Sequence, residues 1–227
     1  MIEFELEIFQ GHPIIREGEN IILLDTGSPT TIHTHQDLTF CDEQFRCETN
    51  HMGILSSQDL SELLGTRVTT LLGTNCLSHF KVLLDYSGQK AKFMGREEGV
   101  PGTQINTDSL MGVPLIEVEI ANQSHKLFLD TGAKLSYLDV DFTSHLENQG
   151  TEQDFYPGLG AFTTPVYEIT THFEGYGFSA RYGNLPTIMV QTLRGLGING
   201  ILGYDFFNKF KVCLDLKDGL MGYELNK

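Results

Sequence analysis

The chain of 227 residues is poor in basic side chains, with 15 Lys and Arg against 30 Asp and Glu. Its formal net charge is −15 at pH 7. Nucleic-acid phosphates and anionic membrane surfaces would repel such a chain, so we expect no nucleic acid and no membrane as a partner. It also lacks any run of ~20 consecutive apolar residues, which a membrane-spanning helix needs.

Cysteine and proline are scarce as well, at four and seven residues, whereas glycine reaches 24. With 40% apolar and 20% charged residues, the composition is typical of a globular protein and excludes disorder, collagen and coiled coil. The first ten residues, MIEFELEIFQ, lack the basic segment and apolar run of a secretory signal. We therefore expect a cytoplasmic protein with mostly free thiols.

Segments of the first half return in the second half in the same order. They pair ILLDTGS at 22–28 with LFLDTGA at 127–133, LLG at 71–73 with ILG at 201–203, and FKVLLD at 80–85 with FKVCLD at 210–215. A weaker echo links GHPII at 11–15 to GVPLI at 112–116. Because several landmarks recur in order, we interpret the chain as an internal duplication.

The duplication predicts one unit over 1–100, a polar linker over 101–110, and a second unit over 111–227. Both units should be mostly β, since 2–9 and 115–120 alternate apolar and polar residues. Few and short helices are expected. The clearest are SQDLSELL at 57–64, with Gly65 after it, and 139–149, with Gly150 after it.

Each unit places one carboxylate, Asp25 or Asp130, on a glycine-containing loop directly after a buried apolar strand. Two such units packed about an approximate two-fold axis would bring these carboxylates face to face. Two carboxylates that share a site cannot both ionise easily, so one keeps a proton. The pair can then take a proton from water and give one to a peptide carbonyl, with no metal or cofactor required.

These motifs resemble those of the aspartic peptidases, and the whole chain is most similar to a single-chain protein made of two retropepsin-like halves. The resemblance implies an all-β, bilobal acid-protease fold with two β-barrel-like lobes and a cleft between them. It also implies that Thr26 and Thr131 brace the catalytic loops, which Gly27, Gly132 and their neighbours shape. The apolar-Gly segments would pack beneath those loops.

The family covers its cleft with a β-hairpin flap, and the second unit offers a place for one. It has 25 more residues between its DTG and apolar-Gly segments than the first unit has. We expect Tyr156, Gly158, Leu159 and Gly160 to form the flap and contact substrate. Since the first unit has no such glycine-rich run, a single flap is expected, on the second half.

The residue after DTG differs between the loops, being Ser28 in the first and Ala133 in the second. In this family a hydroxyl at that position can donate a hydrogen bond to the carboxylate of its own loop. Such a bond would favour the ionised form of Asp25 and leave the proton on Asp130. The alternative is that Ser28 caps its turn through a backbone contact.

Five potential ligands lie close together in the first unit. They are His33, His35, Cys41, Cys47 and His51. Their spacing matches no closed zinc motif. We favour a polar surface loop with two free thiols, while a zinc site and a Cys41–Cys47 disulfide remain alternatives.

The sequence predicts an aspartic endopeptidase that acts on peptide or protein substrates. It should be a monomer, since one chain supplies both carboxylates. The second possibility is a catalytically silent module that holds an extended peptide in the same cleft by strand addition.

Overall fold

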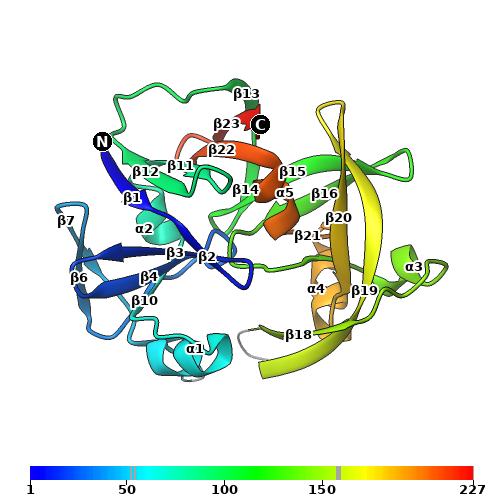
Figure 1. Ribbon diagram of the computed structural model, residues 1–227, viewed down its shortest axis with the longest axis horizontal. Helices are drawn as coiled ribbons and strands as arrows, with labels where there is room; N and C mark the ends of the chain where they lie inside the picture. Colours follow the sequence, from blue (N-terminus) through cyan, green and yellow to red (C-terminus); the bar gives the residue numbers. More distant parts are fainter. Residues whose placement is uncertain (52, 54, 157–159, 227) are drawn as a thin grey trace.

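The computed structural model describes residues 1–51, 53, 55–156 and 160–226 (Figure 1). Strands predominate and the helices are few and short, so the expected all-β class is confirmed. Among the described residues, no helix has the length and apolar character needed to cross a membrane.

A five-stranded sheet carries the first DTG segment. Its order is β2 (Glu7–Phe9), β3 (His12–Glu17), β4 (Asn20–Leu24), β10 (Thr70–Leu72) and β5 (Ile32–His33). Strand β4 runs parallel to β10, so that Leu24 lies opposite Leu72, and β10 runs antiparallel to β5. Two small two-stranded sheets follow along the chain. They are β6 (Asp37–Phe40) with β7 (Glu43–Arg46), and β8 (Asn50–His51) with β9 (Leu55–Ser56).

An eight-stranded sheet carries the second DTG segment. Its order is β14 (Asp108–Leu110), β15 (Val113–Ile120), β16 (Gln123–Leu129), β21 (Gly200–Leu202), β17 (Ser136–Leu138), β20 (Tyr176–Asn184), β19 (Gly160–Phe173) and β18 (Thr151–Tyr156). Here β16 runs parallel to β21, with Leu129 opposite Leu202, and β21 runs antiparallel to β17. The strands around the two DTG segments are therefore paired in the same way.

A six-stranded sheet combines strands from both halves of the chain, in the upper part of Figure 1. Its order is β1 (Ile2–Glu5), β12 (Lys90–Met94), β11 (Lys81–Asp85), β22 (Phe210–Asp215), β23 (Leu220–Leu225) and β13 (Thr103–Asn106). At its centre Leu83 lies opposite Cys213, its own counterpart in the duplicated FKVLLD and FKVCLD segments. Each half thus contributes three equivalent strands to this sheet, which joins the two halves.

The weak echo in the sequence corresponds to two equivalent hairpins. Gln10 and Gly11 connect β2 to β3 with φ of 50° and 90°. Met111 and Gly112 connect β14 to β15 with φ of 54° and 83°. Positive φ at both turn positions is typical of a two-residue hairpin, and glycine adopts it without strain.

The predicted helix over 57–64 is confirmed as α1 (Ser57–Leu64). The side chains of Ser56 and Asp59 form a capping box at its start, and Gly65 ends it with φ of 69°. The helix expected over 139–149 is wrong in length, because α3 spans only Val140–Thr143. Helix α4 (Thr187–Gly195) was not predicted, and α2 (Thr74–Leu77) and α5 (Tyr204–Lys209) each follow an apolar-Gly segment.

The linker expected over 101–110 is not an irregular connection. It contains β13 and β14, which lie at the edges of two different sheets.

The largest apolar cluster contains residues from both halves, including Phe40 and Phe93 from the first and Phe206 and Phe210 from the second. The two halves therefore share both a sheet and a core.

Candidate active site

The two DTG loops meet at the ends of equivalent strands. Asp25 follows β4 and Asp130 follows β16. The backbone N–H of Asp25 donates to the carbonyl of Leu72 at 3.1 Å, and that of Asp130 donates to the carbonyl of Leu202 at 2.9 Å. Each loop is thus anchored in the same way to its own apolar-Gly segment.

The two carboxyl groups are half-buried, and each lies close against the glycine of the opposite loop. Glycine makes this approach possible. A Cβ at Gly132 would lie 2.6 Å from Asp25 Cγ, and a Cβ at Gly27 would lie under 3.0 Å from the Asp130 carboxylate. Any side chain at either glycine would therefore push the opposite carboxylate away.

Thr26 and Thr131 hold the loops together through four reciprocal hydrogen bonds. Thr26 N–H donates to Thr131 Oγ1 at 2.9 Å, and Thr131 N–H donates to Thr26 Oγ1 at 3.0 Å. Each hydroxyl then donates across to the other half, Thr26 to the Leu129 carbonyl and Thr131 to the Leu24 carbonyl, both at 2.7 Å. Both threonines are buried, so the loops form a rigid base beneath the carboxylates.

Burial raises the pKa of both carboxyl groups. It raises the pKa of Asp25 well above its usual range, with the nearby Asp130 charge as the next cause. It raises the pKa of Asp130 to about 6, against hydrogen bonds from the N–H groups of Gly132 and Gly27 that lower it. Of these, the Gly132 bond to Asp130 Oδ1 measures 2.8 Å. A proton therefore stays on the pair near neutral pH.

The structure adds two hydroxyl groups that sequence reasoning missed. Thr31 Oγ1 accepts from the N–H of Gly73 at 3.0 Å, and Ser136 Oγ accepts from the N–H of Gly203 at 3.1 Å. Both residues come six positions after their aspartate, which is the signal that could have identified them. These two hydrogen bonds connect the segment that follows each DTG loop to the glycine of the apolar-Gly segment of the same half.

The Ser28 hydroxyl does not contact Asp25 as first expected. It donates to the carbonyl of Thr30 at 2.8 Å, so Ser28 caps its own turn. The N–H groups of Gly27 and Ser28, not the hydroxyl, are the donors that lower the pKa of Asp25. The predicted charge asymmetry based on Ser28 and Ala133 is therefore wrong, because the short side chain reaches a nearer backbone acceptor.

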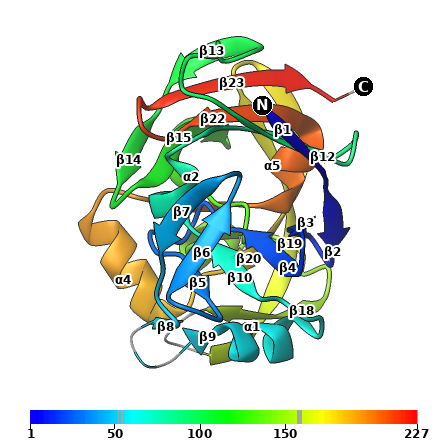
Figure 2. The same cartoon turned by 90° about the vertical axis from the view of Figure 1, so that its left-hand side faces the viewer.

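Strands β18 and β19 form the hairpin expected in the second half. Tyr156 lies opposite Gly160 at its end, while Gly158 and Leu159 lie outside the described residues. The β18 strand runs beside α1 of the first half (Figures 1 and 2), and Phe155 packs on the apolar cluster that contains Leu60. The hairpin therefore extends from the second half across to the first.

The first half carries a hairpin at the equivalent position, which the sequence analysis did not expect. In the first half β8 and β9 pair in the same register, with His51 opposite Leu55 as Tyr156 is opposite Gly160. Gly53 follows Asp25 by 28 residues, as Gly158 follows Asp130. One glycine in HMGIL was too weak a signal, but the equal spacing identifies the position. Each DTG loop is thus followed by a hairpin, a short one and a long one.

The five potential ligands in the first half do not assemble. Cys41 and Cys47 are free thiols, but both are buried, so this segment is not the polar surface loop that the sequence favoured. Cys47 instead belongs to the same apolar cluster as Cys76. His33 is buried against Thr69 and Thr70. Among the described residues, no group of three or more His, Cys, Asp or Glu could hold a metal ion.

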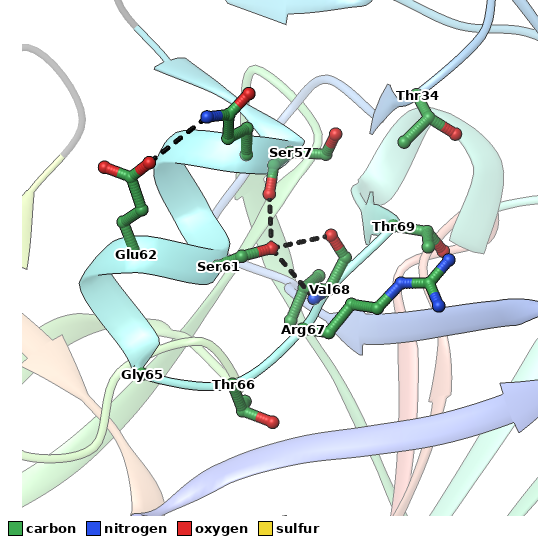
Figure 3. A pocket seen from close by; sticks show the side chains of 10 residues that line it. Thr34, Ser57, Ser61, Glu62, Gly65, Thr66, Arg67, Val68 and Thr69 are labelled. Carbon is green, nitrogen blue, oxygen red and sulfur yellow. Dashed lines mark hydrogen bonds between the residues drawn. The ribbon is translucent and has the colours of Figure 1, made fainter.

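An open pocket beside α1 lies apart from the two carboxylates (Figure 3). The Ser61 hydroxyl, one of the lining groups, accepts from the N–H of Val68 and lies within hydrogen-bond distance of the carbonyls of Ser57 and Val68. Among the residues that the structure describes, its lining includes none from either DTG loop.

No protein-family model matches the chain, and no curated protein matches it either.

Proposed function

We propose that the chain is an aspartic-type endopeptidase whose two halves form two lobes related by an approximate two-fold axis. The observation that carries this proposal is that the carboxyl groups of Asp25 and Asp130 each lie against the glycine of the opposite loop, on reciprocally braced loops. A carboxyl pair that retains one proton supplies a general base and a general acid at one point.

In the proposed reaction, a water molecule between the carboxyl groups gives a proton to the ionised member. Its oxygen attacks the peptide carbonyl carbon, while the protonated member gives its proton to the carbonyl oxygen. The intermediate, a gem-diol, then collapses: one of its hydroxyl groups returns its proton to the ionised member as the C=O bond re-forms. The C–N bond breaks, and the leaving nitrogen takes the proton of the other member. Proton number and charge are unchanged over the cycle.

The two hairpins support a peptide as the substrate. An extended peptide can pair with strands that close over it, and closure excludes water from the carboxylates. The β18–β19 hairpin is anchored to the Asp130 side of the site, where the Tyr137 hydroxyl donates to the carboxylate of Asp154. Lys134 adds an ion pair with Glu152 at 3.3 Å.

The test incubates the purified chain with a peptide library and identifies the products by mass spectrometry. Cleavage by the wild type, none by Asp25→Asn or Asp130→Asn, and inhibition by a statine-type compound would support the proposal. Peptide binding that survives in all three proteins without cleavage would favour the silent binding module instead.

A further inference from the structure

One buried histidine connects the site to both halves of the molecule. His12 is the first residue of β3, directly after the Gln10–Gly11 turn, and only 3% of it is exposed. Its Nδ1 lies 2.9 Å from the carbonyl oxygen of Gly132. Because a carbonyl oxygen can only accept, Nδ1 carries the hydrogen of the ring and donates it.

Gly132 is the residue on which both carboxylates depend. Its N–H donates to Asp130, and its α-carbon faces Asp25 so closely that no side chain fits. A hydrogen bond to the Gly132 carbonyl therefore fixes the part of the loop that orients the pair. His12 makes this bond from the first half of the chain, 120 residues away.

The same ring contacts the long hairpin. The centroids of the His12 and Phe155 rings are 6.3 Å apart, with the ring planes tilted by 35°. Burial lowers the pKa of the His12 imidazole. The charge of Asp154 raises this pKa, and that of Lys134 lowers it. The neutral ring thus lies between the β18 strand and the Asp130 loop.

The duplication shows that this contact is specific to one loop. In the equivalent hairpin the position of His12 is taken by Val113, since His12 pairs with Phe9 as Val113 pairs with Leu110. Valine has no side-chain donor, so it cannot give the Asp25 loop a matching hydrogen bond. The histidine is therefore not required by the hairpin itself.

We propose that His12 is a positioning residue that holds the Asp130 loop through Gly132 and couples it to the β18–β19 hairpin. This inference rests on the proposed peptidase function. Its two contacts are chemically different, one a hydrogen bond and the other a ring packing. They can therefore be removed one at a time.

Three variants separate the contacts. His12→Asn keeps a donor near Nδ1 but removes the ring, His12→Phe keeps the ring but removes the donor, and His12→Val removes both. We expect His12→Phe to lower kcat about tenfold with little change in KM, because the loop loses one hydrogen bond. His12→Asn should keep kcat and raise KM about threefold, since only the hairpin loses packing. His12→Val should show both effects.

A matched control is His125→Val, which removes another buried histidine whose ring packs edge-on against Phe142 at 4.9 Å. It should leave both kinetic constants near the wild-type values. The inference is overturned if the three His12 variants change kcat and KM in the same proportion, or if they behave like the control.

Hydrogen exchange provides a readout that does not need activity. Amides of 130–134 should exchange faster in the Val and Phe variants only, and amides of 151–156 faster in the Val and Asn variants only. If the wild type cleaves no peptide but this pattern holds, the peptidase proposal fails and the coupling stands. Uniform exchange in all variants overturns the coupling itself.

Discussion

The two DTG loops match closely in their hydrogen bonds, whereas the two hairpins that follow them differ greatly. The bonds between Thr26 and Thr131 measure 2.9 and 3.0 Å in the two directions. Among the residues that the structure describes, the hairpin of the first half pairs two residues on each strand and that of the second half pairs six. Where the two loops meet, each hydrogen bond joins a residue of one half to a residue of the other. A change in one loop therefore disturbs both. Away from this contact each half is free to differ.

The largest loss of activity is expected when one of the two loops loses its carboxylate. Asp25→Asn and Asp130→Asn should each lower kcat/KM by at least about a thousandfold, because one carboxyl group cannot be both acid and base. Steady-state assays with circular dichroism as a folding control measure this. More than trace activity in either variant would contradict the pairing.

The next comparison concerns the threonines. Thr26→Val and Thr131→Val should each destabilise the protein by about 1–3 kcal/mol, since buried backbone groups lose their partners. The two losses should agree, because the contacts agree. Chemical denaturation measures both, and Thr26→Ser and Thr131→Ser serve as controls that keep the hydroxyl. A large difference between the two valine variants would show that the loops are not energetically equivalent.

The pH profile tests the carboxylates together. Because the pKa of Asp130 is raised to about 6, kcat/KM should fall about tenfold per pH unit below that value, as Asp130 becomes protonated and cannot accept from water. Activity should therefore be highest near neutral pH. An acid limb near pH 3, measured on one peptide, would contradict this assignment.

The same raised pKa predicts an effect on stability. A raised carboxyl pKa favours folding below its unfolded value near 4, and this contribution is lost as pH rises through about 6. Asp130→Asn should thus raise the melting temperature at pH 7 and change it little at pH 4. Scanning calorimetry at the two pH values decides it, and equal shifts at both would contradict it.

A smaller effect is expected from the hydrogen bond that anchors the β18–β19 hairpin. Tyr137→Phe removes the hydroxyl that donates to Asp154, and it should raise KM about threefold while kcat stays unchanged. Tyr167→Phe, on β19, serves as a matched loss of a hydroxyl. Equal KM values for the two variants would exclude the anchor.

The smallest effect is expected at the position where the loops differ in sequence. Ser28→Ala should leave the pH profile of kcat/KM unchanged, because the Ser28 hydroxyl donates to Thr30 and not to a carboxylate. A shift of either limb would show that the hydroxyl reaches Asp25 during turnover.

Local patterns explain which features the sequence could predict. Helix α1 was predictable from its cap residues, and the meeting of Asp25 and Asp130 from the repeat of apolar strand and DTG. The position of His12 was not predictable, since its partner Gly132 lies 120 residues away and only packing brings them together. The prediction for Ser28 failed for the opposite reason: both possible acceptors are close in the sequence, and only the folded turn decides that the hydroxyl donates to Thr30.

The pairing of Leu83 with Cys213 has a consequence for how this molecule can evolve. If the two halves were separate identical chains, that pair would be one position facing its own copy, and every substitution would occur twice. A single chain encodes each side once. His12 can therefore differ from Val113, and one hairpin can lengthen alone, without a second change elsewhere. The continuous backbone makes the two sides of the site genetically independent, although they remain mechanically joined.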